Sequence, residues 1–121
     1  MSELTLYGLS PKTCDTMKKA CLYLTEHKIP FTLYDYRQEN LSLSLIEKWL
    51  LHLSYLELLN KRSTTWRQLD NSIKENLNEQ NIKNLFLQYP TLIKRPLFCC
   101  NEQYLVGFHA KKLQDFLNNC K

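Results

Sequence analysis

Apolar residues recur with two different periods along this chain, and the change of period separates predicted strands from predicted helices. An apolar run at residues 4–7 predicts a short strand that ends at Gly8. A second strand is predicted over residues 31–36, after the break at Pro30. Between them the period is helical from Cys14 on, with one apolar face made of Met17, Ala20, Cys21 and Leu24. Strand, helix and strand in this order predict a right-handed βαβ unit with two parallel strands.

The middle of the chain, residues 41–89, shows the helical period only. Ser44 followed by Glu47 matches a capping box at a helix start, and a break falls near residues 54–55. A weak helix is then predicted, and a firmer one that ends before Pro90. The apolar positions of these two helices are Trp66, Leu69, Ile73 and Leu77 in the first, and Ile82, Leu85, Phe86 and Tyr89 in the second.

The last part of the chain returns to strands. Residues 97–100 and 104–106, joined by residues 101–103, predict a hairpin that ends at Gly107. A closing helix follows, with an apolar stripe of Leu113, Phe116, Leu117 and Cys120.

The order βαβ, helices, ββα is typical of a thioredoxin-like α/β fold with helices inserted between its halves. We expect one domain over residues 1–121, because 121 residues suit a single hydrophobic core. Its thioredoxin-like core is predicted at about residues 1–40 and 90–121, and the helical insertion at about residues 41–89.

Composition excludes several classes of protein. No apolar run is long enough to span a bilayer and no signal-peptide pattern is present, so we expect a cytoplasmic protein. The net charge of +4 suits anionic ligands, but the dispersed lysines show no nucleic-acid signature. Two glycines leave no room for a phosphate-binding or dinucleotide-binding loop. Five scattered cysteines, an odd number, argue against a disulfide framework and favour a free reactive thiol.

Cys14 is the candidate nucleophile. A thiol at a helix N-terminus faces backbone N–H groups that have no helical acceptor, and these groups stabilise a thiolate. Lys12 adds positive charge nearby, Asp15 opposes it in part, and Ser10 or Thr13 is expected to cap the helix. The alternative is that Cys14 is a small packing residue.

Two polar segments at predicted strand ends are candidates for further parts of a site. In thioredoxin-like folds the residue before the third strand is commonly a cis-proline that faces the nucleophile, and Pro96 occupies this position. Arg95 is then expected to project toward Cys14 and to meet an anion there, the alternative being a surface arginine at an ordinary strand start. The other segment, residues 35–37, is interpreted as a solvated strand exit.

The remaining cysteines suggest no second reactive centre. Cys21 is expected to be inert on the buried stripe, and Cys99 and Cys100 should point to opposite sheet faces. Cys120 is a resolving thiol only if the last helix lies near Cys14. The spacing of Cys99, Cys100 and His109 matches no standard zinc site, so no metal is expected.

These segments together resemble the arsenate reductase family of thioredoxin-like proteins, which includes the ArsC, Spx and YffB proteins, and the YffB proteins look closest. The matching pieces extend from one end of the chain to the other, which makes their combination specific. They are LYG at residues 6–8, CDTMKKA at 14–20, DYR at 35–37, LLNKRSTTWRQL at 58–69, LIKRP at 92–96 and LVGF at 105–108.

The resemblance implies roles for the main candidate residues. Cys14 matches the nucleophilic cysteine of the family and Arg95 its anion-binding arginine; Lys12 is a further candidate anion binder because of its charge near Cys14. Arg62 resembles a residue that lines the same cleft in YffB-like proteins, or it is a surface cation on a polar loop. The implied activity is that of a thiol reductase acting on a small oxidised or oxyanion substrate. No bound cofactor is implied, with glutathione as co-substrate and glutathione or a glutaredoxin-type thiol as partner.

Two departures from the family pattern bear on the alternatives. Arsenate reductases hold the oxyanion with three arginines, but the alignment places Asn60 and Gly107 at two of these positions, so arsenate is not the expected substrate. Spx regulators carry a CxxC switch, and here Met17 replaces the second cysteine. A regulator that binds RNA polymerase in the manner of Spx is the alternative function, and a non-reactive relative with a packed cysteine is a third possibility.

Overall fold

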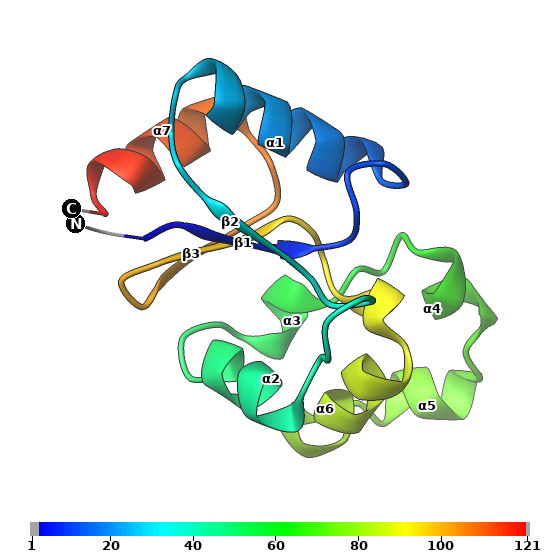
Figure 1. Cartoon of the computed structure of the whole chain (residues 1–121). Coiled ribbons are helices and arrows are strands. Elements are labelled where there is room, and N and C mark those ends of the chain that lie inside the picture. The colour runs from blue at the N-terminus through cyan, green and yellow to red at the C-terminus, as the bar shows by residue number, and fades with distance from the viewer. Residues whose placement is uncertain (1–2, 121) are drawn as a thin grey trace. The chain divides into compact units, whose positions relative to one another are not determined.

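The computed structural model describes residues 3–120, which form two compact units (Figure 1). The first unit takes the chain up to Glu39 and again from Arg95 on, and the second unit is Asn40–Lys94. The second unit therefore contains the helical stretch expected at residues 41–89 and continues beyond it. It continues because the backbone up to Lys94 pairs with residues 58–60: Lys94 N–H donates to the Leu58 carbonyl at 2.7 Å.

The first unit is built on a four-stranded sheet. Its strands are β1 (Thr5–Gly8), β2 (Thr32–Asp35), β3 (Leu97–Cys100) and β4 (Gln103–Val106), in the spatial order β2-β1-β3-β4. β2 runs parallel to β1, with Leu6 beside Leu33, and β3 runs antiparallel to β1, with Leu6 beside Phe98. This mixed sheet confirms the predicted thioredoxin-like α/β fold.

Two helices, α1 (Asp15–Glu26) and α7 (Ala110–Asn118), lie side by side on one face of the sheet (Figure 1). The apolar stripes of both helices pack on alternate residues of the strands, as the period of two requires. Tyr7 and Tyr34 point to the opposite face, where their ring centroids are 5.3 Å apart. The core between helices and sheet contains Leu4, Leu6, Met17, Ala20, Leu24, Phe98, Cys100, Leu113 and Cys120.

The hairpin turn is tighter than expected. β3 and β4 are joined by Asn101 and Glu102 alone, rather than by three residues, and both have positive φ, 52° and 65°. A two-residue turn of this hand matches the twist of the flanking strands, and asparagine at its first position tolerates it well.

The second unit is helical throughout. Its elements are α2 (Leu43–Leu50), α3 (Tyr55–Leu58), α4 (Thr64–Gln68), α5 (Asn71–Glu75), α6 (Glu79–Gln88) and the 3₁₀ turn η1 (Pro90–Leu92). α2 and α6 pack against each other, and their fully buried side chains include Ile46, Trp49, Ile82 and Phe86. Among residues 3–120, no helix is both long enough and apolar enough to cross a membrane.

Two local predictions for this unit were wrong. The cap of α2 is Ser42, whose Oγ accepts from Leu45 N–H, and the capping box lies instead at the start of α3, between Ser54 and Glu57. The weak helix is broken in two because Leu69 is extended, with ψ of 147°.

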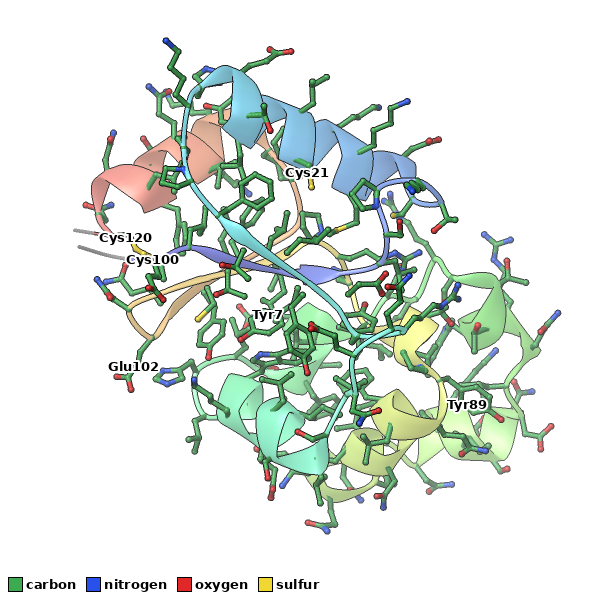
Figure 2. All side chains as sticks on the ribbon, viewed as in Figure 1. Tyr7, Cys21, Tyr89, Cys100, Glu102 and Cys120 are labelled. Atoms are coloured by element: carbon green, nitrogen blue, oxygen red, sulfur yellow. A yellow bond between two sulfur atoms is a disulfide. The ribbon has the colours of Figure 1, made fainter. Side chains whose placement is uncertain are left out.

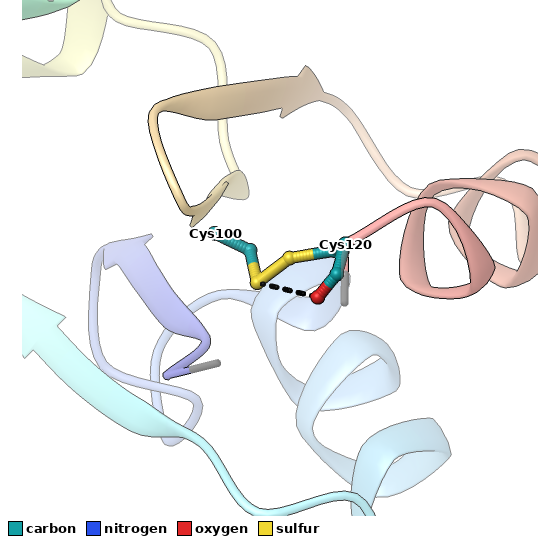
Figure 3. The surroundings of a disulfide bond; sticks show 2 residues. All are labelled: Cys100 and Cys120. Atoms are coloured by element: carbon teal, nitrogen blue, oxygen red, sulfur yellow. Dashed lines mark hydrogen bonds between the residues drawn. A yellow bond between two sulfur atoms is a disulfide. The ribbon is translucent and has the colours of Figure 1, made fainter. Parts of the chain in front are cut away.

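The C-terminal helix is tied to the hairpin by a single disulfide, which the argument against a disulfide framework did not predict. Cys100 and Cys120 lie next to each other beside the end of β3 (Figure 2), and their sulfur atoms are bonded (Figure 3). Their Cα atoms are 6.0 Å apart, within the usual range, and both residues are buried. Cysteine spacing alone does not reveal such a pairing, because the contact exists only after α7 folds back onto the sheet.

Candidate functional site

The ends of β1 and β2 and the start of β3 lie at the same edge of the sheet. Cys14 and Arg95 belong to the segments that flank these strands at this edge. β1 ends at Gly8, and its antiparallel pairing of Tyr7 with Leu97 places Arg95 and Pro96 at the same edge, just before β3. β2 is parallel to β1 and ends there too, with Tyr36 N–H donating to the Gly8 carbonyl at 3.1 Å. The loop after Gly8 leads from this edge to α1.

The loop before α1 is organised by Ser10, although not as a helix cap. The Ser10 carbonyl accepts from the N–H groups of Thr13 and Cys14, both at 3.1 Å, and its Oγ accepts from Lys12 N–H at 3.2 Å. The expectation that Ser10 or Thr13 caps the helix is wrong, because the N-cap residue is Cys14 itself. Its extended backbone, with φ of −128° and ψ of 114°, sets the Cys14 side chain at the mouth of α1.

The geometry brings Arg95 to Cys14. Arg95 Nε donates a hydrogen bond to Cys14 Sγ at 3.4 Å, and both side chains are partly exposed. The first N–H groups of α1 have no acceptor within the helix, and the helix dipole adds positive potential at the same end. The sulfur atom of Cys14 therefore lies beside two sources of positive potential and remains within reach of solvent.

Gly8 permits the close approach of strand, helix and arginine at this point. A Cβ atom at residue 8 would overlap the side chain of Met17 and lie 3.4 Å from Arg95 Cβ. Any larger residue would require the buried end of the Met17 side chain to move within the core.

The Arg95–Pro96 segment is held in place from the other side by Gly107. The Arg95–Pro96 peptide bond is cis, as expected for this position, and Pro96 is buried. The Pro96 carbonyl accepts from Gly107 N–H at 2.9 Å. Gly107 has φ of +86°, a conformation that favours glycine over every other residue.

Lys12 and Arg62 are both exposed. Lys12 belongs to the loop that Ser10 organises, two residues before Cys14. Arg62 belongs to the second unit, where its N–H donates to Asn60 Oδ1 and its carbonyl accepts from Arg67. Anion binding by either residue stays a prediction.

Tyr36 was missed by the sequence interpretation of residues 35–37 as a solvated strand exit. Tyr36 is only 4% exposed, whereas Arg37 beside it is exposed. Burial, as the largest cause, raises the pKa of Tyr36 to about 12; the nearby Arg95 lowers it and the nearby Cys14 raises it. The signal in the sequence was that parallel strands bring their carboxyl ends to one edge, where ligands of such sheets bind.

The other thiols lie away from Cys14. Cys21 is two helical turns further along α1, about 10 Å by the rise of an α-helix, and burial raises the pKa of its thiol. Cys99 pairs with Thr5 at the far end of β1, on the opposite face from the core that contains Cys100. Cys120 is bonded to Cys100 at that same far edge, so the hypothesis that Cys120 resolves a Cys14 adduct is wrong for this form (Figure 2).

Comparison with known proteins points to one family. The sequence profile of the ArsC family matches residues 9–116. An uncharacterized protein of Haemophilus influenzae is 40% identical over 92% of this chain and 96% of its own length, and global transcriptional regulator Spx 1 of Oceanobacillus iheyensis is 33% identical over 94% and 86%. The solved structure of a YffB protein has a TM-score of 0.85 and 34% identity, covering 93% of this chain and 96% of that protein.

Proposed function

Because this chain belongs to the ArsC family, we propose that it is a thiol reductase in which Cys14 is the nucleophile and glutathione the co-substrate. The single observation that carries the proposal is the hydrogen bond from Arg95 Nε to Cys14 Sγ at the mouth of α1. A guanidinium and the helix N-terminus both stabilise the thiolate over the thiol, and the thiolate is the form that attacks a disulfide.

The proposed reaction exchanges one disulfide for another. The Cys14 thiolate attacks the glutathione sulfur of a substrate mixed disulfide, R–S–S–G. A bond forms between Cys14 and glutathione, the substrate S–S bond breaks, and the electron pair leaves with the thiolate R–S⁻. A second glutathione thiolate then attacks the Cys14 adduct, which releases oxidised glutathione and restores the Cys14 thiolate. The net reaction converts R–S–S–G and one free glutathione into R–SH and oxidised glutathione, so the disulfide passes from the substrate to glutathione.

The placement of the other cysteines supports resolution by an external thiol. The free cysteines among residues 3–120 are Cys14, Cys21 and Cys99, and the last two lie away from the Cys14 edge of the sheet. Glutathione suits the role because it is small and anionic, and Cys14 and Arg95 are both partly exposed to it. Lys12, exposed on the loop before Cys14, is proposed to attract its carboxylates.

Arsenate is not the proposed substrate. The sequence alignment places Gly107 at a position where arsenate reductases carry an arginine. Gly107 has φ of +86°, and a non-glycine residue in this conformation is strained. An arginine at residue 107 would therefore carry this backbone strain.

Mass spectrometry after exposure to oxidised glutathione tests the proposal. We expect a single glutathione adduct, mapped to Cys14, which Cys14→Ser abolishes and the matched control Cys21→Ser keeps. Arg95→Gln should slow formation of the adduct about tenfold, because it removes a charged hydrogen-bond donor from the sulfur. Equal modification of Cys21 or Cys99, or an adduct rate unchanged by Arg95→Gln, would contradict the proposal.

A second candidate function rests on the likeness to Spx 1, which extends over 94% of this chain. In this alternative the protein is a regulator that binds RNA polymerase. Met17 stands where Spx has its second switch cysteine, and because methionine has no thiol, a local disulfide with Cys14 is not available. The Met17 side chain is instead fully buried beside Gly8. Stable co-purification with polymerase subunits, together with no reduction of mixed disulfides, would favour regulation over catalysis.

A further inference from the structure

The hydroxyl of Tyr36 is a buried polar group for which the described structure provides no bond. Tyr36 is 4% exposed, and none of the residues 3–120 accepts from or donates to its Oη atom. Buried hydroxyl groups in proteins are nearly always hydrogen-bonded, and leaving one unsatisfied costs free energy. An unsatisfied buried hydroxyl therefore needs a structural or functional explanation.

The backbone holds Tyr36 at the edge of the sheet where Cys14 and Arg95 lie. Its N–H donates to the Gly8 carbonyl at 3.1 Å. Gly8 lies close to both Met17 of α1 and Arg95, since a Cβ atom on Gly8 would meet both side chains. Tyr36 and the two site residues are thus joined through one glycine and belong to the same compact unit.

The two site residues, Arg95 and Cys14, are among the groups that act electrostatically on the phenol. Besides burial, the groups that shift the pKa of Tyr36 are Arg95, Cys14, Arg37 and Asp35, with Arg95 the strongest of the four. The result, about 12, keeps the phenol protonated at neutral pH. It lies well above the value of about 8.5 for a thiol, so Tyr36 can donate a hydrogen bond to a thiolate without giving up its proton.

We propose that Tyr36 is a further catalytic residue, whose hydroxyl donates a hydrogen bond to the sulfur atom that leaves when Cys14 attacks a mixed disulfide. This role rests on the thiol reductase activity proposed above. Negative charge develops on that leaving sulfur as the S–S bond breaks, and a donor fixed in a buried setting stabilises it more than water does. Arg95 donates a hydrogen bond to the attacking sulfur and Tyr36 donates one to the leaving sulfur. The attacking and leaving sulfur atoms therefore each have their own donor.

The test uses Tyr36→Phe, which removes only the oxygen atom. Mixed disulfides of glutathione with 2-mercaptoethanol, cysteine and 5-thio-2-nitrobenzoate serve as substrates, because their leaving thiols differ widely in acidity. We expect kcat/KM for the least acidic leaving thiol to fall about 10- to 100-fold. For 5-thio-2-nitrobenzoate, which leaves readily without help, we expect little change. The dependence of rate on leaving-group acidity therefore steepens in the variant.

Tyr34→Phe is the matched control. Tyr34 lies in β2 two residues earlier, about 7 Å further from the edge, and packs on Tyr7. We expect it to leave the dependence on leaving-group acidity unchanged. Urea unfolding should show no loss of stability in Tyr36→Phe, since its hydroxyl bonds to no described group.

The outcomes separate this role from the activity on which it rests. Wild-type rates in Tyr36→Phe, or an equal fall for all three substrates, would overturn the role of Tyr36 while leaving Cys14 chemistry in place. Failure of the wild-type protein to form a glutathione adduct at Cys14 would instead overturn the thiol reductase activity and this proposal with it.

Discussion

Reduction of the Cys100–Cys120 disulfide should lower the free energy of unfolding of the first unit by about 3 kcal/mol. The two cysteines are 20 residues apart in sequence. The chain-entropy relation for cross-links assigns about 3 kcal/mol to a loop of this length, because the bond restricts the unfolded chain. The loop contains β4 and α7, so the cross-link secures the C-terminal helix to the sheet.

Urea unfolding with and without a phosphine reductant measures the effect. With a urea m-value of roughly 1–3 kcal/mol/M, the midpoint should fall by about 1–3 M on reduction. The probe must report on the first unit, and both tryptophans, Trp49 and Trp66, belong to the second. Far-UV circular dichroism combined with amide exchange in α7 is therefore the appropriate measurement.

Two variants separate the disulfide from other effects of the reductant. Cys120→Ala should unfold at the same urea concentration in both conditions, because it has no bond to reduce. Cys99→Ala, which removes a free thiol from the same strand, should keep the full response to reductant. An unchanged α7 exchange rate and midpoint in wild type, with the disulfide verified by mass before reduction, would refute the reasoning.

Three further predictions concern single side chains. Gly8→Ala should destabilise the fold by about 1–3 kcal/mol in urea unfolding, since its Cβ would overlap the buried Met17, and a neutral result would contradict that packing. Asn78→Ala should cost about 1 kcal/mol by removing the capping box of α6; Asp70→Ala should cost little, because Asp70 makes no side-chain cap bond, and thermal melts compare the two. The pKa of Tyr36 is raised from 10.0 to about 12. The stabilisation that its protonated phenol contributes is therefore complete below pH 10 and is lost as pH rises toward 12. In urea titrations at pH 9 and 11.5, the free energy of unfolding should fall less between the two pH values in Tyr36→Phe than in wild type. An equal fall in both proteins would count against this effect.

Features that depend on neighbouring residues were predictable. The helix that starts at Cys14 follows from apolar spacing, and Pro96 at the start of a strand follows from the element order. The first residue of a helix was less predictable where two nearby residues of the same type could serve as its cap. Ser42 and Ser44 can both cap a helix, and the choice of Ser42 depends on which backbone N–H its hydroxyl reaches, here that of Leu45.

By itself, the sequence determined the thioredoxin-like order of elements and the pairing of a helix-terminal cysteine with an Arg-Pro segment, because periodicity and proline act locally. Tertiary structure alone decided the burial of Tyr36, the disulfide from Cys100 to Cys120 and the atoms through which Arg95 meets Cys14, Nε and Sγ at 3.4 Å. Each of these needs segments distant in sequence to meet. Which of them meet is settled by how the strands pair and how the helices pack, and spacing along the chain does not encode it.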